Sequence, residues 1–212
     1  LIDINFIYMR VKCLSFHDKK TGWSVRDIDF MRLTLLVGAS GVGKTKILRS
    51  LLTLVNISKG RSENGAEWSL SFEIGTDSYI WRGAFSVQDD ESLDFLRPNE
   101  LSIPIEYEYL TKNGEVIIDR TSDYLQFNGQ QTVKLEADKS AISLLKEEDV
   151  ISPVFQAINK IYMPRTENAG GIRITPILSD NDAPIHDLKS IKRLHFLDPI
   201  DKLFLLYKNK LS

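Results

Sequence analysis

The chain has few of the features that mark secreted, membrane-spanning or strongly polyanion-binding proteins. Its single cysteine, Cys13, excludes an internal disulfide and favours a reducing compartment. No apolar run approaches the roughly 20 residues of a membrane span, and no segment has the pattern of a signal peptide. The chain has 27 basic and 29 acidic residues, so its net charge of −2 does not point to a nucleic-acid partner, which stays an open alternative. We expect a cytoplasmic protein with no membrane partner.

A phosphate-binding loop is the most informative motif in the chain. Eight consecutive residues fit G-x-x-x-x-G-K-[ST], namely Gly38, Ala39, Ser40, Gly41, Val42, Gly43, Lys44 and Thr45. The glycines let backbone N–H groups turn inward around a triphosphate. Lys44 would neutralise the β- and γ-phosphates, the Thr45 hydroxyl would help to hold Mg²⁺, and Lys46 extends the basic end of the loop. The motif predicts ATP and Mg²⁺ as cofactors.

The segments on either side of this loop strengthen the prediction. Upstream, Leu33–Val37 is a short apolar run typical of a buried parallel strand. Downstream, apolar residues recur at helical spacing, at Ile47, Leu48, Leu51, Leu52 and Val55. A strand, a glycine loop and a helix in that order place the positive end of the helix against the phosphates. The fold class that we predict is therefore α/β, a P-loop NTPase.

The rest of the chain divides by pattern within one predicted ATPase head portion, residues 1–212. Residues 1–60 would hold the core strands, Ile4–Phe16 and Trp23–Phe30, with the P-loop and its helix. Residues 66–137 would form an antiparallel β subdomain, because alternating runs are separated by turns such as Asn113-Gly114. Residues 138–212 would form a helical part. In it we expect a short strand at Lys160–Met163 and an amphipathic tail, 185–211, broken near Pro199.

This order of features resembles the first half of an ABC-type ATPase head. Within that group the chain is most similar to the SMC-like AAA-family ATPases of OLD nucleases and of Septu-type or retron-linked antiphage systems. The resemblance implies an ABC-ATPase-like N-terminal lobe that dimerises, or forms a higher oligomer of heads, around ATP. It also implies control of an effector, a nuclease, in antiphage defence or DNA metabolism. Ile161–Arg165 is similar to a strand leading toward the Q-loop in such heads, and Pro199–Leu211 to the helix before the signature region.

The second half of such a head is not found in the sequence, so we identify no catalytic residue. Val116–Asp119 resembles a Walker B strand, but Arg120 follows where a catalytic Glu belongs. The Asn113-Gly114 turn makes this run the return arm of a hairpin. Leu194–Asp198 ends at Pro199 in helical context, and no signature motif occurs. ATP hydrolysis is therefore expected of the intact parent protein only, and the alternative is a nucleotide-binding scaffold that never hydrolyses.

Some further residues are candidates for the nucleotide site. Trp23, close upstream of the loop, is our choice for stacking on adenine, over Phe16 and His17. The residue that senses the γ-phosphate through Mg²⁺ could be any of Gln88, Glu167 and Asn168, and Arg165 is a further candidate phosphate contact. A GTPase is disfavoured because Asn159-Lys160-Ile161-Tyr162 lacks the carboxylate that would bond guanine.

Overall fold

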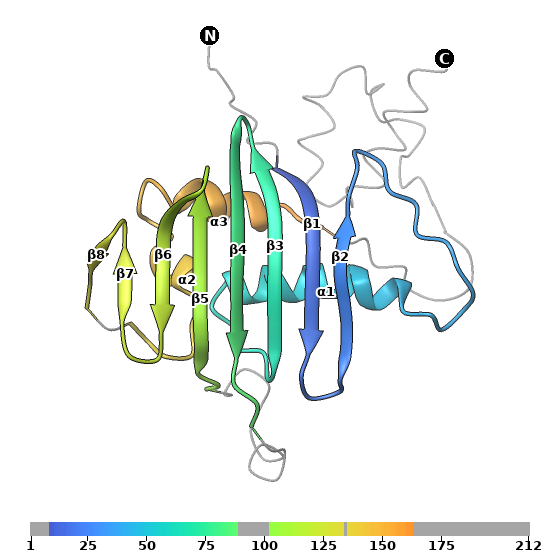
Figure 1. Cartoon of the computed structure of the whole chain (residues 1–212), viewed down its shortest axis with the longest axis horizontal. Coiled ribbons are helices and arrows are strands. Elements are labelled where there is room, and N and C mark those ends of the chain that lie inside the picture. Colours follow the sequence, from blue (N-terminus) through green and yellow to red (C-terminus); the bar gives the residue numbers. More distant parts are fainter. Residues whose placement is uncertain (1–8, 89–101, 134, 163–212) are drawn as a thin grey trace, which may run out of the picture. The chain divides into compact units, whose positions relative to one another are not determined.

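The computed structural model describes residues 9–88, 102–133 and 135–162. The chain divides into two compact units, residues 1–162 and 163–212, and the second lies outside the described residues. The first unit contains one eight-stranded sheet with the order β2-β1-β3-β4-β5-β6-β7-β8 (Figure 1). Every neighbouring pair of strands in it is antiparallel.

Eight strands and three helices follow one another along the described part of the chain. They are β1 (Met9–Asp18), β2 (Trp23–Asp29), α1 (Lys44–Ser58), β3 (Ala66–Ile74), β4 (Asp77–Phe85), β5 (Ile105–Lys112), β6 (Glu115–Thr121), β7 (Leu125–Phe127), β8 (Gln130–Gln131), α2 (Ala141–Leu144) and α3 (Ser152–Ile158). None of these helices is long and apolar enough to cross a membrane.

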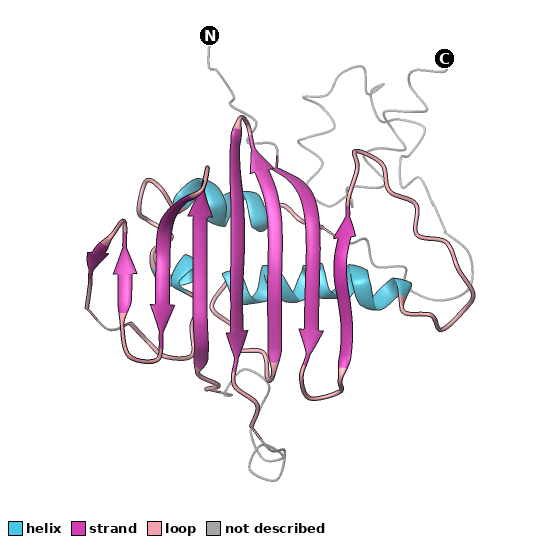
Figure 2. Cartoon of the chain, in the orientation of Figure 1, coloured by secondary structure: helices cyan, strands magenta, loops and turns pink. Residues whose placement is uncertain are grey.

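Alternation of apolar and polar side chains gives the sheet one covered and one open face. On β3, Trp68, Leu70 and Phe72 are buried, while the serines and glutamates between them are partly exposed. The helices lie on one side of the sheet (Figure 2), where buried residues of α1 and α3 join the same apolar core. Gly83 lets Trp68 lie close to β4, since a Cβ at that position would come within 2.4 Å of the indole ring.

The predicted parallel α/β P-loop fold is wrong. Leu33–Val37 forms no strand, and the side chains of Leu33, Leu35 and Val37 are 89%, 82% and 78% exposed. A strand in a parallel sheet requires at least one paired neighbour and cover on both faces, and no described strand pairs with this run. Instead β1 and β2 join the same antiparallel sheet as β3 to β8, so the ABC-like lobe with a separate antiparallel subdomain is not what these residues build.

Other predicted elements fare differently. The Asn113-Gly114 hairpin is confirmed: it joins β5 to β6, with positive φ at both residues (52° and 87°), as a two-residue hairpin turn requires. Asp119 therefore lies in a return strand, where Tyr124 donates a hydrogen bond to it at 3.0 Å. The strand predicted at Lys160–Met163 does not form over 160–162, and Met163 lies outside the described residues. The predicted tail, 185–211, lies outside them too.

A buried carboxylate ties three strands to the helical layer. Glu108 on β5 has no exposed side-chain surface, and it accepts hydrogen bonds from Trp81 Nε1 (2.9 Å), Ser140 Oγ (2.5 Å) and the Ala141 amide (2.6 Å). Burial raises the pKa of Glu108, and these three hydrogen bonds and the charge of Arg120 oppose that shift. Ser140 in turn caps α2, because its hydroxyl accepts a bond from the Ile142 amide.

Arg120 is the cation of this buried cluster. Its Nη1 lies 3.9 Å from Glu108 Oε2, and its guanidinium donates to the carbonyl oxygens of Lys139 (2.7 Å) and Glu136 (2.5 Å). These bonds hold the segment before α2 against β6. Arg120 is therefore structural. It occupies the position after Val116–Asp119 at which a Walker B strand would have its catalytic glutamate.

Replacing Arg120 with Met should strongly destabilise the fold. The change leaves the Glu108 carboxylate buried without its counter-ion, and removing one member of a buried pair typically costs about 3–5 kcal/mol. Urea unfolding followed by tryptophan fluorescence measures the free energy of unfolding. Arg61→Ala, at an exposed arginine, is the control and should change it by less than about 0.5 kcal/mol. Equal losses in the two variants would show that the cluster does not anchor the sheet.

Candidate nucleotide-binding site

The loop Gly38–Gly43 has a backbone that glycine makes possible. Gly38, Gly41 and Gly43 have φ values of 151°, 85° and 97°, in the region that other residues rarely adopt. Successive amides in such a conformation form a concave nest of N–H groups that suits an anion. The structure thus brings the predicted loop residues together in one turn that leads directly into α1.

The start of α1 is open to an anion. Gly43 is the N-cap and supplies no side-chain hydrogen bond, and the first turn contains no acidic residue. Within the described part of the structure, the amides of Lys44, Thr45 and Lys46 have no hydrogen-bond acceptor. Lys44 and Lys46 also add positive charge at the end of the helix where the dipole is already positive. This arrangement is unfavourable alone and becomes favourable when a polyanion binds.

Lys44 closes the loop from one side. Its ammonium donates to the carbonyl oxygens of Gly38 at 2.7 Å and of Ala39 at 2.6 Å. The cation therefore lies against the first two carbonyl groups of the loop that carries it. A phosphate oxygen entering the nest could replace either carbonyl as acceptor, so that the charge of Lys44 would neutralise the ligand without a large rearrangement.

Trp23, which the sequence analysis predicts to stack on adenine, lies beside the loop. A Cβ built on Gly43 would lie 3.6 Å from Trp23 Nε1, and Lys46 Nζ lies 5.6 Å from the centre of the indole ring. The Phe16 ring packs against the indole in a tilted arrangement, with the two ring centroids 6.3 Å apart. A pocket of about 300 Å³ opens here between the β1–β2 hairpin and α1, lined in part by Trp23, Lys46 and Arg49.

The other predicted residues are not gathered at this loop. His17 belongs to a hollow on the open face of the sheet, described below. Gln88 is fixed after β4, where its amide donates to Asn64 Oδ1 at 2.9 Å. Arg165, Glu167 and Asn168 lie outside the described residues.

The Mg²⁺ role predicted for Thr45 needs further oxygen ligands besides its own hydroxyl. The Thr45 side chain is exposed at the start of α1, where its hydroxyl is accessible to a metal. No group of three or more His, Cys, Asp or Glu side chains gathers into a metal site among the residues that the structure describes. Asp18, in the pocket beside Trp23, is committed to the β1–β2 turn, because the amides of Lys20 and Thr21 and the Thr21 hydroxyl all donate to it. Binding of Mg²⁺ would therefore depend on the nucleotide's own phosphates.

Sequence reasoning missed a second hollow. It lies on the open face of the sheet and is lined in part by Ser15, Arg26, Glu67, Arg82 and Tyr107. The signal was present in the polar positions that alternate along β3 and β4, but only the cross-strand register shows which of them meet.

No family model, no curated protein and no solved structure matches this chain, so the function must be argued from these two sites alone.

Substituting Gly43 should separate backbone strain from anion binding. Gly43→Ala and Gly129→Ala each force a side chain onto a positive φ, of 97° and 73°, and each should cost roughly 1–2 kcal/mol of folding free energy. Gly129 lies in the turn between β7 and β8, where a Cβ has open space. Only Gly43→Ala should weaken the binding of inorganic triphosphate, by about tenfold or more, in a calorimetric titration. Equal affinities of the two variants would mean that the loop does not hold the anion.

Proposed function

We propose that this chain binds ATP with Mg²⁺ through the loop Gly38–Thr45. One observation carries the proposal: three glycines at positive φ lead into a helix whose first amides have no acceptor, with Lys44 lying across the loop. The binding chemistry needs only this local arrangement of amides and one ammonium. It does not depend on the parallel sheet that the sequence wrongly predicted.

Adenine is proposed over guanine because the Asn159-Lys160 pair cannot recognise guanine. Trp23 lies next to the loop, with its Nε1 toward Gly43 and Lys46 over its ring, and stacking on an aromatic ring accepts any base once Lys46 moves aside. Guanine would need a specific carboxylate and amide, and the Asn159-Lys160 pair does not supply them. The amide nitrogen of Asn159 already donates to the Phe155 carbonyl at 2.8 Å and to Ser58 Oγ at 3.3 Å. That side chain ties α3 to α1 and is committed to the fold.

Hydrolysis is proposed for the intact protein as an assembly. Phosphoryl transfer to water needs an oriented nucleophile and a second source of positive charge, besides the grip on the β- and γ-phosphates. Of these groups, the described residues offer the loop and Lys44 for the β- and γ-phosphates, and the Thr45 hydroxyl. Under this proposal two or more copies assemble around ATP, complete one another's sites, and control a nuclease effector.

A nucleotide-binding scaffold without hydrolysis is the second proposal. The observation that favours it is the use of Arg120 and Asp119 in the buried cluster and the β5–β6 hairpin, which leaves the Walker B-like run without a catalytic carboxylate. A scaffold of this kind would change its contacts when ATP binds and would release ATP unchanged.

Lys44→Ala should abolish tight ATP binding and leave the fold intact. Within the described residues, Lys44 hydrogen-bonds to the loop alone, so stability should change little. Loss of the charge should weaken ATP·Mg²⁺ binding by at least about tenfold. Isothermal titration calorimetry gives the dissociation constant and circular dichroism confirms folding. Lys59→Ala, at the other end of α1, is the matched control. ATP affinity that stays at the wild-type value in Lys44→Ala would refute the phosphate assignment.

Solution mass distinguishes the ATPase assembly from the scaffold. The intact protein should form a dimer or larger oligomer with ATP·Mg²⁺, return to its starting mass as phosphate is released, and stay unassembled when Lys44 is replaced with Ala. Light scattering coupled to gel filtration and a phosphate-release assay follow both events. Binding without phosphate release would favour the scaffold, and a mass that never responds to ATP would contradict an ATP-gated assembly.

A further inference from the structure

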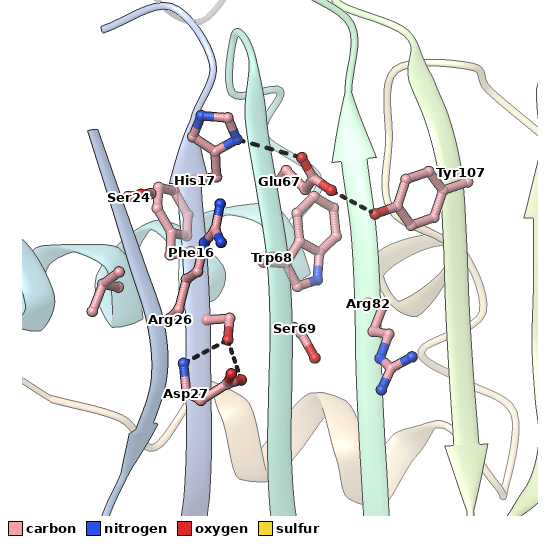
Figure 3. A pocket seen from close by; sticks show the side chains of 12 residues that line it. Phe16, His17, Ser24, Arg26, Asp27, Glu67, Trp68, Ser69, Arg82 and Tyr107 are labelled. Atoms are coloured by element: carbon pink, nitrogen blue, oxygen red, sulfur yellow. Dashed lines mark hydrogen bonds and ion pairs between the residues drawn. The ribbon is translucent and has the colours of Figure 1, made fainter. Parts of the chain in front are cut away.

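The open face of the sheet carries a polar groove that the proposed nucleotide site does not use. It has a volume of about 410 Å³ and crosses β2, β1, β3, β4 and β5 (Figure 3). Its side chains are mostly polar, in contrast to the apolar core on the other face. The groove therefore offers hydrogen-bonding groups of four neighbouring strands and the Tyr107 hydroxyl of a fifth to one ligand.

A β-bulge shapes one side of this groove. In the pairing of β1 with β2, Leu14 faces Ile28 and Phe16 faces Val25, so Ser15 stands opposite both Arg26 and Asp27. Asp27 has a φ of 49°, which is uncommon for a residue other than glycine. Bulges re-aim side chains and are over-represented next to functional sites, where local strain is retained. Here the bulge puts two consecutive residues of β2 on the groove side.

The acidic groups of the groove are already engaged with neighbours. Ser15 Oγ donates to Asp27 Oδ1 at 2.9 Å and accepts from the Asp27 amide at the same distance. Glu67 accepts a hydrogen bond from the Tyr107 hydroxyl at 3.2 Å, and its other oxygen lies 3.6 Å from His17 Nδ1. Burial and the Glu67 charge raise the pKa of Tyr107 to about 12, so its hydroxyl keeps its proton at neutral pH.

In the part of the chain that the structure describes, the two arginines of the groove, unlike His17, are not engaged with a carboxylate. Within the described residues, Arg26 and Arg82 form no hydrogen bond or ion pair, and the Ser69 hydroxyl makes no hydrogen bond. Ser69 lies directly opposite Ser15 on one side and Arg82 on the other. Arg26 and Arg82 thus stand on strands three spacings apart, about 14 Å between backbones, with serines between them. The groove has unused positive charge and donors and little unused negative charge.

We propose that this groove binds a phosphate ester between Arg26 and Arg82, with the Ser69 hydroxyl as a further donor. A phosphate suits donors that approach from separate strands, because its oxygens point in several directions. A carboxylate presents one edge, which a single guanidinium fork saturates. The phosphate belongs either to a free phosphomonoester or to a nucleic-acid strand, and both offer the same group to the two arginines.

The test uses the Lys44→Ala protein, so that the loop at α1 does not contribute. Amide NMR spectra are recorded with inorganic phosphate, with a short single-stranded oligothymidylate and with acetate. Phosphate or the oligonucleotide should shift the amides of Ser15, Ser69 and Arg82, and Arg26→Ala or Arg82→Ala should weaken that binding about tenfold. A response to inorganic phosphate identifies a free phosphate ester as the ligand, and a response to the oligonucleotide alone identifies a strand.

Arg61→Ala is the matched control, since it removes an exposed arginine that does not line the groove. Its affinity should equal that of the Lys44→Ala parent. The proposal is overturned if neither phosphate probe shifts groove amides, if acetate shifts them as strongly as phosphate, or if Arg61→Ala weakens binding as much as Arg26→Ala. The Lys44→Ala background lacks the lysine proposed to bind the ATP phosphates. A negative result for the groove in this background therefore does not decide whether the loop at α1 binds ATP.

Discussion

Antiparallel pairing of β1 with β3 is the constraint on which the rest of the structure depends. The two strands pair from Met9 with Ile74 to Asp18 with Ala66, and the residues between them in sequence form β2, the glycine loop and α1. The chain leaves the sheet after β2 and returns at β3, so α1 must cross the covered face on the way. This crossing puts the apolar residues Leu54, Val55 and Ile57 of α1 into the core. It also leaves the first turn of α1 exposed beside Trp23.

The same pairing defines both proposed sites. On the covered side it brings the β1–β2 hairpin, and with it Trp23, alongside the start of α1. On the open side it aligns Ser15 with Ser69, which the β3–β4 pairing then aligns with Arg82. At both places, within the described residues, basic side chains lie without a carboxylate partner: Lys44 and Lys46 at the loop, and Arg26 and Arg82 in the groove. A bound anion would form charge-assisted hydrogen bonds with these cations, which is why we infer anionic ligands at both.

Local signals were enough to predict individual elements, but not the fold class. The Asn113-Gly114 turn and the alternating runs on either side of it fix a hairpin within one stretch of chain, and the helical spacing after Lys44 fixes α1. The parallel strand predicted at Leu33–Val37 does not form, and local signals could not show this. Its apolar composition gives no information about neighbours, and a parallel strand is stable only when other strands lie beside it. The fold class was wrong because a motif that reports on a loop was taken to report on a whole sheet.

The two proposed sites also differ in how far the sequence could predict them. The glycine loop and Trp23 lie close in sequence, so their meeting could be anticipated. The groove instead depends on strand register and on a bulge, which no spacing rule reveals. The most direct measurement of the central claim is hydrogen–deuterium exchange at the amides of residues 41–46, with and without ATP·Mg²⁺. The account predicts marked slowing of exchange there when ATP is bound, because those N–H groups would then donate to phosphate oxygens. Exchange that ATP leaves unchanged in the loop would contradict it.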